Sequence, residues 1–370
     1  MRGMLLGGIA AAVCCPQIAA AQEWTAAVGG EFISGVGYVD AEAAEAAGEV
    51  VADYEVHIVF RLTADNGLTF GAKAELEANG ADGNMDEYVA SVRGAFGTIE
   101  IGAEDGAGDR LLLTPPGCNL SCSGDGDGFL FDYADDVAGD AIDNDGGDSS
   151  DDLKLTYFTP TLGGLTDGDG VRAGVSWGPT GEEGPTSTSG LRDDPFVEVG
   201  ARYDFDLSAA MGDPEAELAL AGAFFAVNDY EDQSAAFAAE LDAFGFGVGG
   251  RYAFLETDDE HNLSLGVQYG TGPWDFGLNG AVVLESEGRG DGDYGISGEV
   301  NYALAPGVTL AAVVEYADYD VSVVTVEARG PTFGTDPATG APVVADPGAP
   351  EQSVVVGDSF AVGLLMEFDF

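Results

Sequence analysis

Basic residues are scarce in this chain. Its 370 residues include 12 lysines and arginines against 66 aspartates and glutamates, a formal net charge of −54. Because contacts with nucleic-acid phosphates depend on Lys and Arg, this balance excludes nucleic-acid binding. Two of the basic residues are lysines, Lys73 and Lys154. Such an acid excess with so few lysines favours a saline habitat, where salt screens the repulsion between like charges.

Long apolar runs and catalytic motifs are also missing from the sequence. No segment past the N-terminus reaches the ~18 consecutive apolar residues of a membrane-spanning helix. The two histidines, His57 and His261, lie far apart, and no Gly-x-Ser-x-Gly elbow occurs, so we expect no enzymatic activity. Glycine is abundant, with 57 residues, but it follows no Gly-x-y period, which excludes collagen.

Two of the four cysteines, Cys14 and Cys15, lie in a segment typical of a secretory signal peptide. Arg2 precedes an apolar stretch that ends in an Ala-x-Ala exit, so we expect residues 1–21 to be cleaved after Ala21. Lipidation at Cys14 is an alternative that the preceding Val disfavours. The mature chain, residues 22–370, then forms a single barrel domain with a charge of −55, because Arg2 is lost and no acid is lost.

The mature chain keeps Cys118 and Cys122. In an exported protein, a pair this close predicts a disulfide more than a redox or metal site. The bond would close a small loop and fix local shape more than global stability. Zinc at this pair would need further ligands, and both histidines are distant in the sequence.

The C-terminal segment Asp358–Phe370 alternates in polarity. The even-numbered positions from Phe360 to Phe370 are all apolar, whereas the odd-numbered ones, apart from Leu365, are small or acidic. A soluble edge strand with such a face would invite aggregation. A strand with lipid on one side and a water-filled lumen on the other would not.

Alternating segments of this kind occur sixteen times, so we predict an all-β fold, a transmembrane antiparallel β-barrel of about 16 strands. Counts of fourteen or eighteen are alternatives. A soluble sandwich or β-helix fits poorly, because inward positions such as Gly247, Gly249 and Arg251 cannot fill a core. The predicted strands are residues 24–40, 54–64, 68–78, 87–96, 99–104, 152–159, 171–177, 196–207, 217–227, 235–242, 244–255, 262–270, 274–285, 294–304, 308–319 and the C-terminal segment.

Short and long connections alternate along this pattern. We expect long links after the first, fifth, seventh and fifteenth strands, and links of a few residues after the second, fourth, tenth, twelfth and fourteenth. The links after the sixth and eighth strands are longer than this rule requires. An even strand count puts both termini on the side of the short, periplasmic turns. The last extracellular loop, residues 320–357, contains its own strand-like stretch, Val321–Val326.

The run Phe96-Gly97-Thr98-Ile99-Glu100-Ile101-Gly102 resembles the Phe-Gly-Thr turn between the fourth and fifth strands of Gram-negative general diffusion porins. With the terminal Phe370, the signal peptide, the length and the sixteen segments, the whole mature chain resembles a porin. Its acidity and glycine content are similar to those of the Rhodobacter-type porins of alphaproteobacteria. The cysteine pair and the long last loop depart from that family's pattern.

This resemblance implies a homotrimer in the outer membrane of a Gram-negative bacterium, in contact with lipid and lipopolysaccharide. It implies passive diffusion of small hydrophilic solutes and ions, and a third loop, here residues 105–151, that folds into the lumen and constricts the pore. A substrate-specific channel and a structural or adhesive surface barrel are the alternatives.

Basic residues fall on the inward parity of their strands. A lipid-facing Arg or Lys at the midplane would cost about 2–4 kcal/mol, which by itself explains the parity. It does not explain why three of these residues occupy consecutive strands at similar distances from the short turns, so we predict that Arg61, Lys73 and Arg93 form one basic wall. The predicted pore-lining basic residues are Arg61, Lys73, Arg93, Lys154, Arg172, Arg202 and Arg251.

The third loop carries the opposite charge, so we expect acid to face base across the constriction. Such a transverse field orients dipolar solutes, and the excess of acid predicts modest cation selectivity. The predicted acidic residues of the pore loop are Glu104, Asp105, Asp125, Asp127, Asp132, Asp135 and Asp136.

The Asp-Gly-rich runs of this loop also suggest Ca²⁺, a hard cation that prefers oxygen ligands. The candidate ligands are Asp125, Asp127, Asp143 and Asp145. Neither run has EF-hand spacing and no tandem nonapeptide repeat occurs, so a solvated loop without metal explains them equally well. No other cofactor is expected.

Overall fold

The computed structural model describes most of the chain past the N-terminus. The described residues are 23–41, 44–77, 85, 87–117, 119–120, 149, 152–164, 169–179, 195–227, 232–256, 259–286, 291–318, 323–326, 332–335, 342–346, 352–355 and 358–370. The predicted signal peptide and the pair Cys118 and Cys122 lie outside them. In this part of the chain no helix has the length and apolar character needed to cross a membrane.

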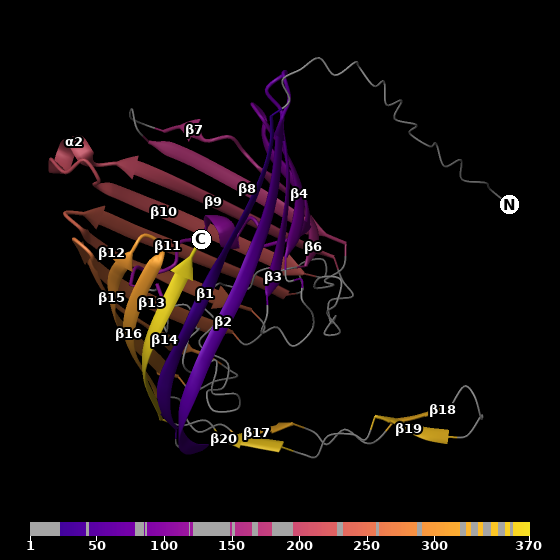
Figure 1. The fold of residues 1–370 in the computed structure, drawn as a ribbon, viewed down its shortest axis with the longest axis vertical. Coiled ribbons are helices and arrows are strands. Elements are labelled where there is room, and N and C mark those ends of the chain that lie inside the picture. The colour runs from indigo at the N-terminus through magenta and orange to yellow at the C-terminus, as the bar shows by residue number, and fades with distance from the viewer. Residues whose placement is uncertain are drawn as a thin grey trace.

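The strands form one closed antiparallel barrel (Figure 1). Strands that follow one another in the chain pair with each other, and β21 pairs with both β16 and β1, which closes the sheet. The prediction of a 16-strand antiparallel barrel is confirmed. The sixteen strands are β1 (Glu23–Ala41), β2 (Ala44–Thr63), β3 (Thr69–Glu77), β4 (Tyr88–Gly94), β5 (Gly97–Ala103), β6 (Leu153–Phe158), β8 (Gly170–Gly178), β9 (Phe196–Asp206), β10 (Glu217–Val227), β11 (Asp232–Ala243), β12 (Phe246–Leu255), β13 (Glu260–Thr271), β14 (Trp274–Glu285), β15 (Tyr294–Ala305), β16 (Val308–Asp318) and β21 (Ser359–Asp369).

Alternation along each strand separates an apolar outer face from an inner face of small and charged side chains. In β21, Phe360 and Leu364 are 42% and 64% exposed, whereas their neighbours Ala361 and Leu365 are 0% and 3% exposed. Because successive side chains of a strand point to opposite faces, the apolar parity lies outside and the other parity lines the interior. The registers of β2 with β3, β3 with β4 and β4 with β5 keep this assignment without a shift.

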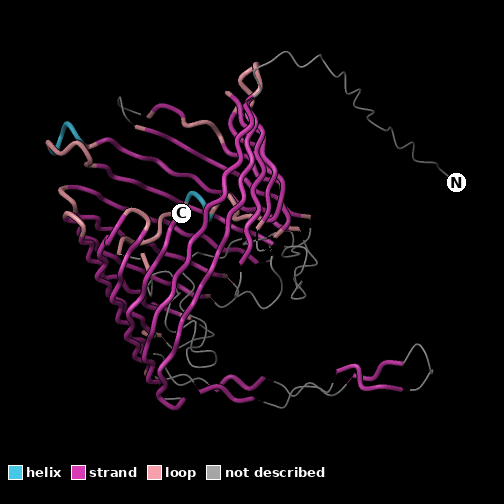
Figure 2. The backbone as a smooth tube through the Cα atoms, viewed as in Figure 1, coloured by secondary structure: helices cyan, strands magenta, loops and turns pink. Residues whose placement is uncertain are grey.

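The turn between β11 and β12 lies just past its predicted position. It consists of Phe244 and Gly245, which were predicted to begin the next strand, whereas β11 includes Ala243. Their φ angles of 56° and 80° are the left-handed backbone that a two-residue hairpin turn needs. The longer links after β6 and β9 hold small elements of their own: β7 (Leu162–Gly163) and α2 (Ser208–Met211). Figure 2 shows how little of the described backbone lies outside strands.

The predicted long link after the first strand is wrong. β1 and β2 are 19 and 20 residues long and pair from Glu23↔Thr63 to Ala41↔Ala44. The alternation continues through the segment expected to be a loop, because Val50 is 81% exposed whereas Val51 is fully buried. Small and β-branched residues therefore extend the hairpin where the sequence analysis ended it.

The last link contains two short antiparallel ladders. β17 (Val323–Val326) pairs with β20 (Gln352–Val355), and β18 (Thr332–Thr335) pairs with β19 (Pro342–Asp346). The strand-like stretch predicted in this loop thus includes β17. Figure 1 places the ladders beyond the barrel, at the end where β1 passes into β2.

Candidate pore site

A buried glutamate on the barrel wall holds the beginning of the third loop. Glu198 of β9 is 1% exposed, and its carboxylate accepts hydrogen bonds from the backbone N–H groups of Gly108, Asp109 and Ser149, the last two at 3.0 and 3.2 Å. The Ser149 hydroxyl donates to the same carboxylate. These contacts fix both described ends of the loop, including the short helix η1 (Asp109–Leu111), to one point of the inner face.

A second set of contacts holds the loop at β14 and β15. The Asn279 side chain donates to the carbonyl of Gly117 at 2.7 Å. Glu299 of β15 accepts from the backbone N–H groups of Asn119 and Leu120 at 3.0 and 2.9 Å. A Cβ atom at Gly266 would lie 2.0 Å from the carbonyl oxygen of Pro116, so glycine there lets the loop touch the wall.

The described loop residues thus contact β9 through Asp109 and Ser149, and β14 and β15 through residues 117, 119 and 120. The remaining loop residues lie outside the described part of the chain, so the acidic face and the Ca²⁺ ligands stay predictions. The residues concerned are Asp125, Asp127, Asp132, Asp135, Asp136, Asp143 and Asp145.

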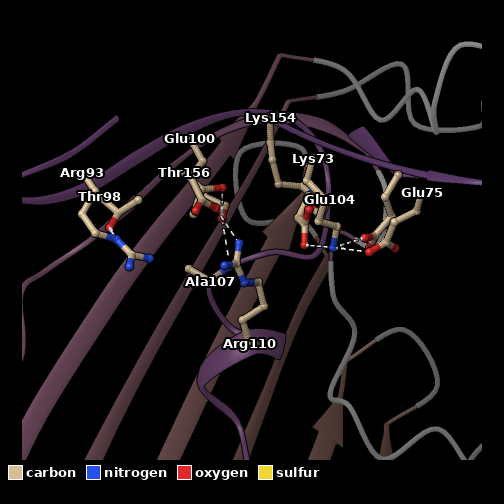
Figure 3. Close-up of polar contacts among 12 residues, drawn as sticks. Lys73, Glu75, Arg93, Thr98, Glu100, Glu104, Ala107, Arg110, Lys154 and Thr156 are labelled. Carbon is tan, nitrogen blue, oxygen red and sulfur yellow. Dashed lines mark hydrogen bonds and ion pairs between the residues drawn. The ribbon is translucent and has the colours of Figure 1, made fainter. Parts of the chain in front are cut away.

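Lys73 lies among three carboxylates. Its Nζ atom is 2.5 Å from Glu75, 2.8 Å from Glu87 and 2.9 Å from Glu104. Figure 3 shows the amine pointing between Glu75 and Glu104. Burial raises the pKa of the Glu104 carboxyl, and the hydrogen bond from Lys73 opposes that rise. The positive charge of Lys73 is thus neutralised locally.

Arg61 and Arg93 remain exposed on the inner face. Arg61 lies opposite Gly71 of β3, and Arg93 lies opposite Thr69 and donates to the hydroxyl of Thr98 at 3.2 Å. Both arginines line a cavity of about 460 Å³ together with Lys73, Glu100, Glu104 and Arg110. The structure therefore brings the three predicted basic residues to one cavity. They lie at different heights on β2, β3 and β4, and the carboxylates of Glu100 and Glu104 line the same cavity.

Arg110, from the loop, was not among the predicted pore residues. Its guanidinium is 2.5 Å from Glu100 and lies over the ring of Phe158, 4.6 Å from the ring centroid. The wall carboxylates Glu75, Glu87 and Glu100 were missed as well. They share the inward parity of Lys73 and Arg93, and that signal could have found them.

The other predicted basic residues lie elsewhere on the inner face. Lys154 is buried and donates to the carbonyl of Glu104. Arg172 and Arg202 both lie beside Asp204. Arg251 is 2% exposed on β12. Among the predicted acidic residues within the described part, Glu104 contacts Lys73, and Asp105 begins the loop.

A closed barrel with an apolar outside and a charged interior defines a transmembrane channel protein. The sequence model of Gram-negative porins matches residues 8–322, most of the chain. The chain belongs to the Gram-negative porin family and is a multi-pass β-barrel of the outer membrane. No curated protein sequence matches it significantly.

Solved porin structures share the fold. An engineered variant of Rhodopseudomonas blastica porin aligns with a TM-score of 0.56 and 16% identity, over 94% of this chain and all of that one. An anion-selective porin from Comamonas acidovorans aligns with a TM-score of 0.59 and 15% identity, again over 94% of this chain and all of that one. At such identities the likeness concerns fold alone.

Proposed function

We propose that this porin passes small hydrophilic solutes by passive diffusion, with a modest preference for cations. The observation that carries the proposal is the charged inner wall around the cavity of Arg61, Lys73 and Arg93. Charged side chains and small residues on the inward parity favour water and polar solutes over apolar ones. The contacts of Glu198 and Glu299 support a third loop that narrows the channel, as the family resemblance implies.

The cation preference rests on charge. The chain has a formal charge of −54, and the wall neutralises Lys73 with three carboxylates. An electronegative channel mouth enriches cations, whereas the exposed Arg61 and Arg93 oppose full selectivity. The Comamonas acidovorans porin, with the same fold, is anion-selective, so wall charge rather than fold must decide the sign.

Reversal potentials across a planar bilayer test this proposal. In a gradient of dilute KCl, we expect a cation-favouring potential. It should weaken near 1 M salt, where the Debye length falls to about 3 Å and mouth charges act at contact range alone. A reversal potential that favours anions in dilute salt would refute cation selectivity and leave the porin fold untouched.

The proposal includes a homotrimer in contact with lipid and lipopolysaccharide. It is supported by the family resemblance and by the exposed apolar residues on the outer face, such as Leu265 and Ile296. Native mass measurement in mild detergent tests the trimer. A protein that stays monomeric across detergents would contradict it.

Three proposed features concern residues outside the described part of the chain: signal cleavage after residue 21, a Cys118–Cys122 disulfide, and Ca²⁺ at the aspartates of the third loop. The intact mass of the exported protein tests the first two, through a start at Gln22 and the loss of two hydrogens. Calorimetry with CaCl₂ tests the third, with Asp125 and Asp127 both replaced by Asn as the comparison.

A further inference from the structure

A histidine and two glutamates meet on the inner wall, away from the arginines of the pore site. Glu55 and His57 come from β2, and Glu75 lies directly opposite His57 on β3. The Nε2 atom of His57 is 2.7 Å from an oxygen of Glu55 and 3.6 Å from an oxygen of Glu75. One ligand atom from each residue can be chosen so that all three lie within 4.8 Å of one another.

The imidazole nitrogen at the centre of this cluster has no hydrogen-bond partner among the described residues. Nε2 of His57 is shielded from solvent, and neither carboxylate meets it with hydrogen-bond geometry. A shielded ring nitrogen normally finds a partner, because an unsatisfied buried polar atom costs about 1–3 kcal/mol. Glu55 and Glu75 converge on this nitrogen as ion-pair partners at 2.7 and 3.6 Å, and a dication bound among the three groups would replace those contacts.

We propose that Glu55, His57 and Glu75 form a binding site for a transition-metal dication of the Zn²⁺ class. Imidazole nitrogen and carboxylate oxygen are ligands that Zn²⁺ accepts, whereas Ca²⁺ and Mg²⁺ prefer oxygen alone. With bonds of about 2.0–2.2 Å, tetrahedral ligand atoms lie about 3.3 Å apart, which small side-chain rotations reach from the present spacing. Water or a passing solute would take the fourth position.

The charges around the cluster also suit a dication. Once both glutamates have lost their protons, a neutral imidazole with two carboxylates carries two negative charges, which one dication balances. Lys73 shares Glu75 with the site, but it keeps Glu87 and Glu104 at 2.8 and 2.9 Å. Oε1 of Glu75 contacts Lys73 and is also the oxygen nearest His57, so a rotation of the carboxylate would present Oε2 to the metal while Oε1 keeps Lys73.

Two other groups of titratable side chains in the described part of the chain can be compared with this site. Glu31, Glu367 and Asp369 also come close together, but they supply carboxylates alone. His261 on β13 has its Nδ1 atom on the hydroxyl of Tyr252, and one carboxylate, Asp259, lies 3.9 Å from its Nε2. His261 is therefore the matched control for the histidine of the site.

Calorimetric titration of the purified protein in detergent with ZnCl₂ tests the proposal directly. Excess Ca²⁺ and high salt suppress diffuse binding to the acidic surface. We expect one saturable Zn²⁺ site per chain. Mutation of residues that only support a metal ligand costs about 10–100-fold in metal affinity. Removal of a ligand itself, in His57→Ala, should therefore weaken Zn²⁺ binding by at least that factor. Glu75→Gln should also weaken it. His261→Ala should bind as the wild type does.

Three results of this titration would overturn the proposal. Absence of a saturable site in the wild type, or equal binding by His57→Ala, overturns the proposal, as does an equal loss in His261→Ala. Circular dichroism checks that each variant is a folded barrel, and Glu55→Gln replaces any variant that is not.

A conductance measurement extends the test and rests on the proposed function. Zn²⁺ held on the wall adds positive charge to the lumen, so it should lower cation preference reversibly in the wild type and leave His57→Ala unchanged. A protein without channel activity would defeat the proposed function, while calorimetry would still decide the metal site.

Discussion

At the scale of single residues, the basic side chains of the inner wall differ in how far acid neutralises them. Lys73 has three carboxylates within 3 Å, whereas Arg61 and Arg93 face the cavity largely exposed. The two arginines therefore supply most of the free positive charge of this wall. Lys73 instead keeps three carboxylates together.

Replacing both Arg61 and Arg93 with Gln should raise the cation-to-anion permeability ratio about twofold or more, because wall potentials strongly change local ion concentrations. The fold should stay intact, since exposed polar substitutions usually change the free energy of unfolding by about 0.5 kcal/mol or less. Lys73→Gln added to this pair should raise the ratio further. Reversal potentials of the double and triple variants provide the measurement, and an unchanged ratio in both would mean that this wall does not border the conducting path.

The raised pKa of Glu104 predicts a pH dependence. Burial raises this carboxyl's pKa above the ordinary value of about 4.3, so its negative charge is present above the raised pKa and lost as pH falls through it. Lys73 then has one charged partner fewer, and cation preference should fall on mild acidification. Glu104→Gln should show the acidified selectivity already at neutral pH. Identical pH profiles for the variant and the wild type would contradict this assignment.

The sequence alone could predict which residues point inward, because parity along a strand is a local property. It could not predict which charges pair. Lys73 pairs with Glu104, which follows the end of β5, and Arg110 of the third loop pairs with Glu100 of β5. Both pairings depend on the register between strands and on the path of the loop. The prediction of a continuous basic wall failed to include the acidic residues between its members for that reason.

At the scale of elements, the third loop is held by two wall carboxylates. Glu198 accepts from the N–H groups of Gly108, Asp109 and Ser149, and Glu299 accepts from those of Asn119 and Leu120. These hydrogen-bond partners are far apart in the chain, so the sequence could not predict them. The strands could be predicted, because each strand shows its alternation of apolar and polar residues locally. The prediction of a loop after the first strand was wrong because residues 44–53 are mostly small or acidic, so the alternation is clear in their exposure and not in their residue types.

Glu198→Ala should loosen the loop. It leaves the N–H groups of Gly108, Asp109 and Ser149 without their acceptor, at a cost of about 1–3 kcal/mol for a buried unsatisfied group. We expect noisier single-channel currents with brief openings to higher conductance. Glu217→Gln, a wall glutamate 3.6 Å from Arg202 and away from these contacts, is the control. Equal current noise in both variants would show that Glu198 does not position the loop.

Deleting residues 121–148 should raise single-channel conductance, because the segment would no longer obstruct the lumen. Leu120 and Ser149 border the deletion and keep their hydrogen bonds to Glu299 and Glu198, so the barrel should remain folded. A Gly-Ser linker long enough to reach from Glu299 to Glu198 joins the two ends. Conductance equal to that of the wild type would contradict a constriction formed by this segment.

At the scale of the whole molecule, the barrel has an apolar outer face and an inner face of small and charged side chains. Such side chains cannot pack as a hydrophobic core. The closure of β21 on β1 leaves no free strand edge, which explains how a chain with Phe370 at its end avoids edge-to-edge aggregation. The acid excess then acts on what the barrel encloses and on its mouths, as a field that depends on salt.

Single-channel recording of the purified protein in a planar bilayer tests the central claim most directly. The account predicts discrete conductance steps that scale with salt concentration, as expected for a water-filled lumen. Protein that inserts into the bilayer as a folded barrel and gives no steps would contradict it.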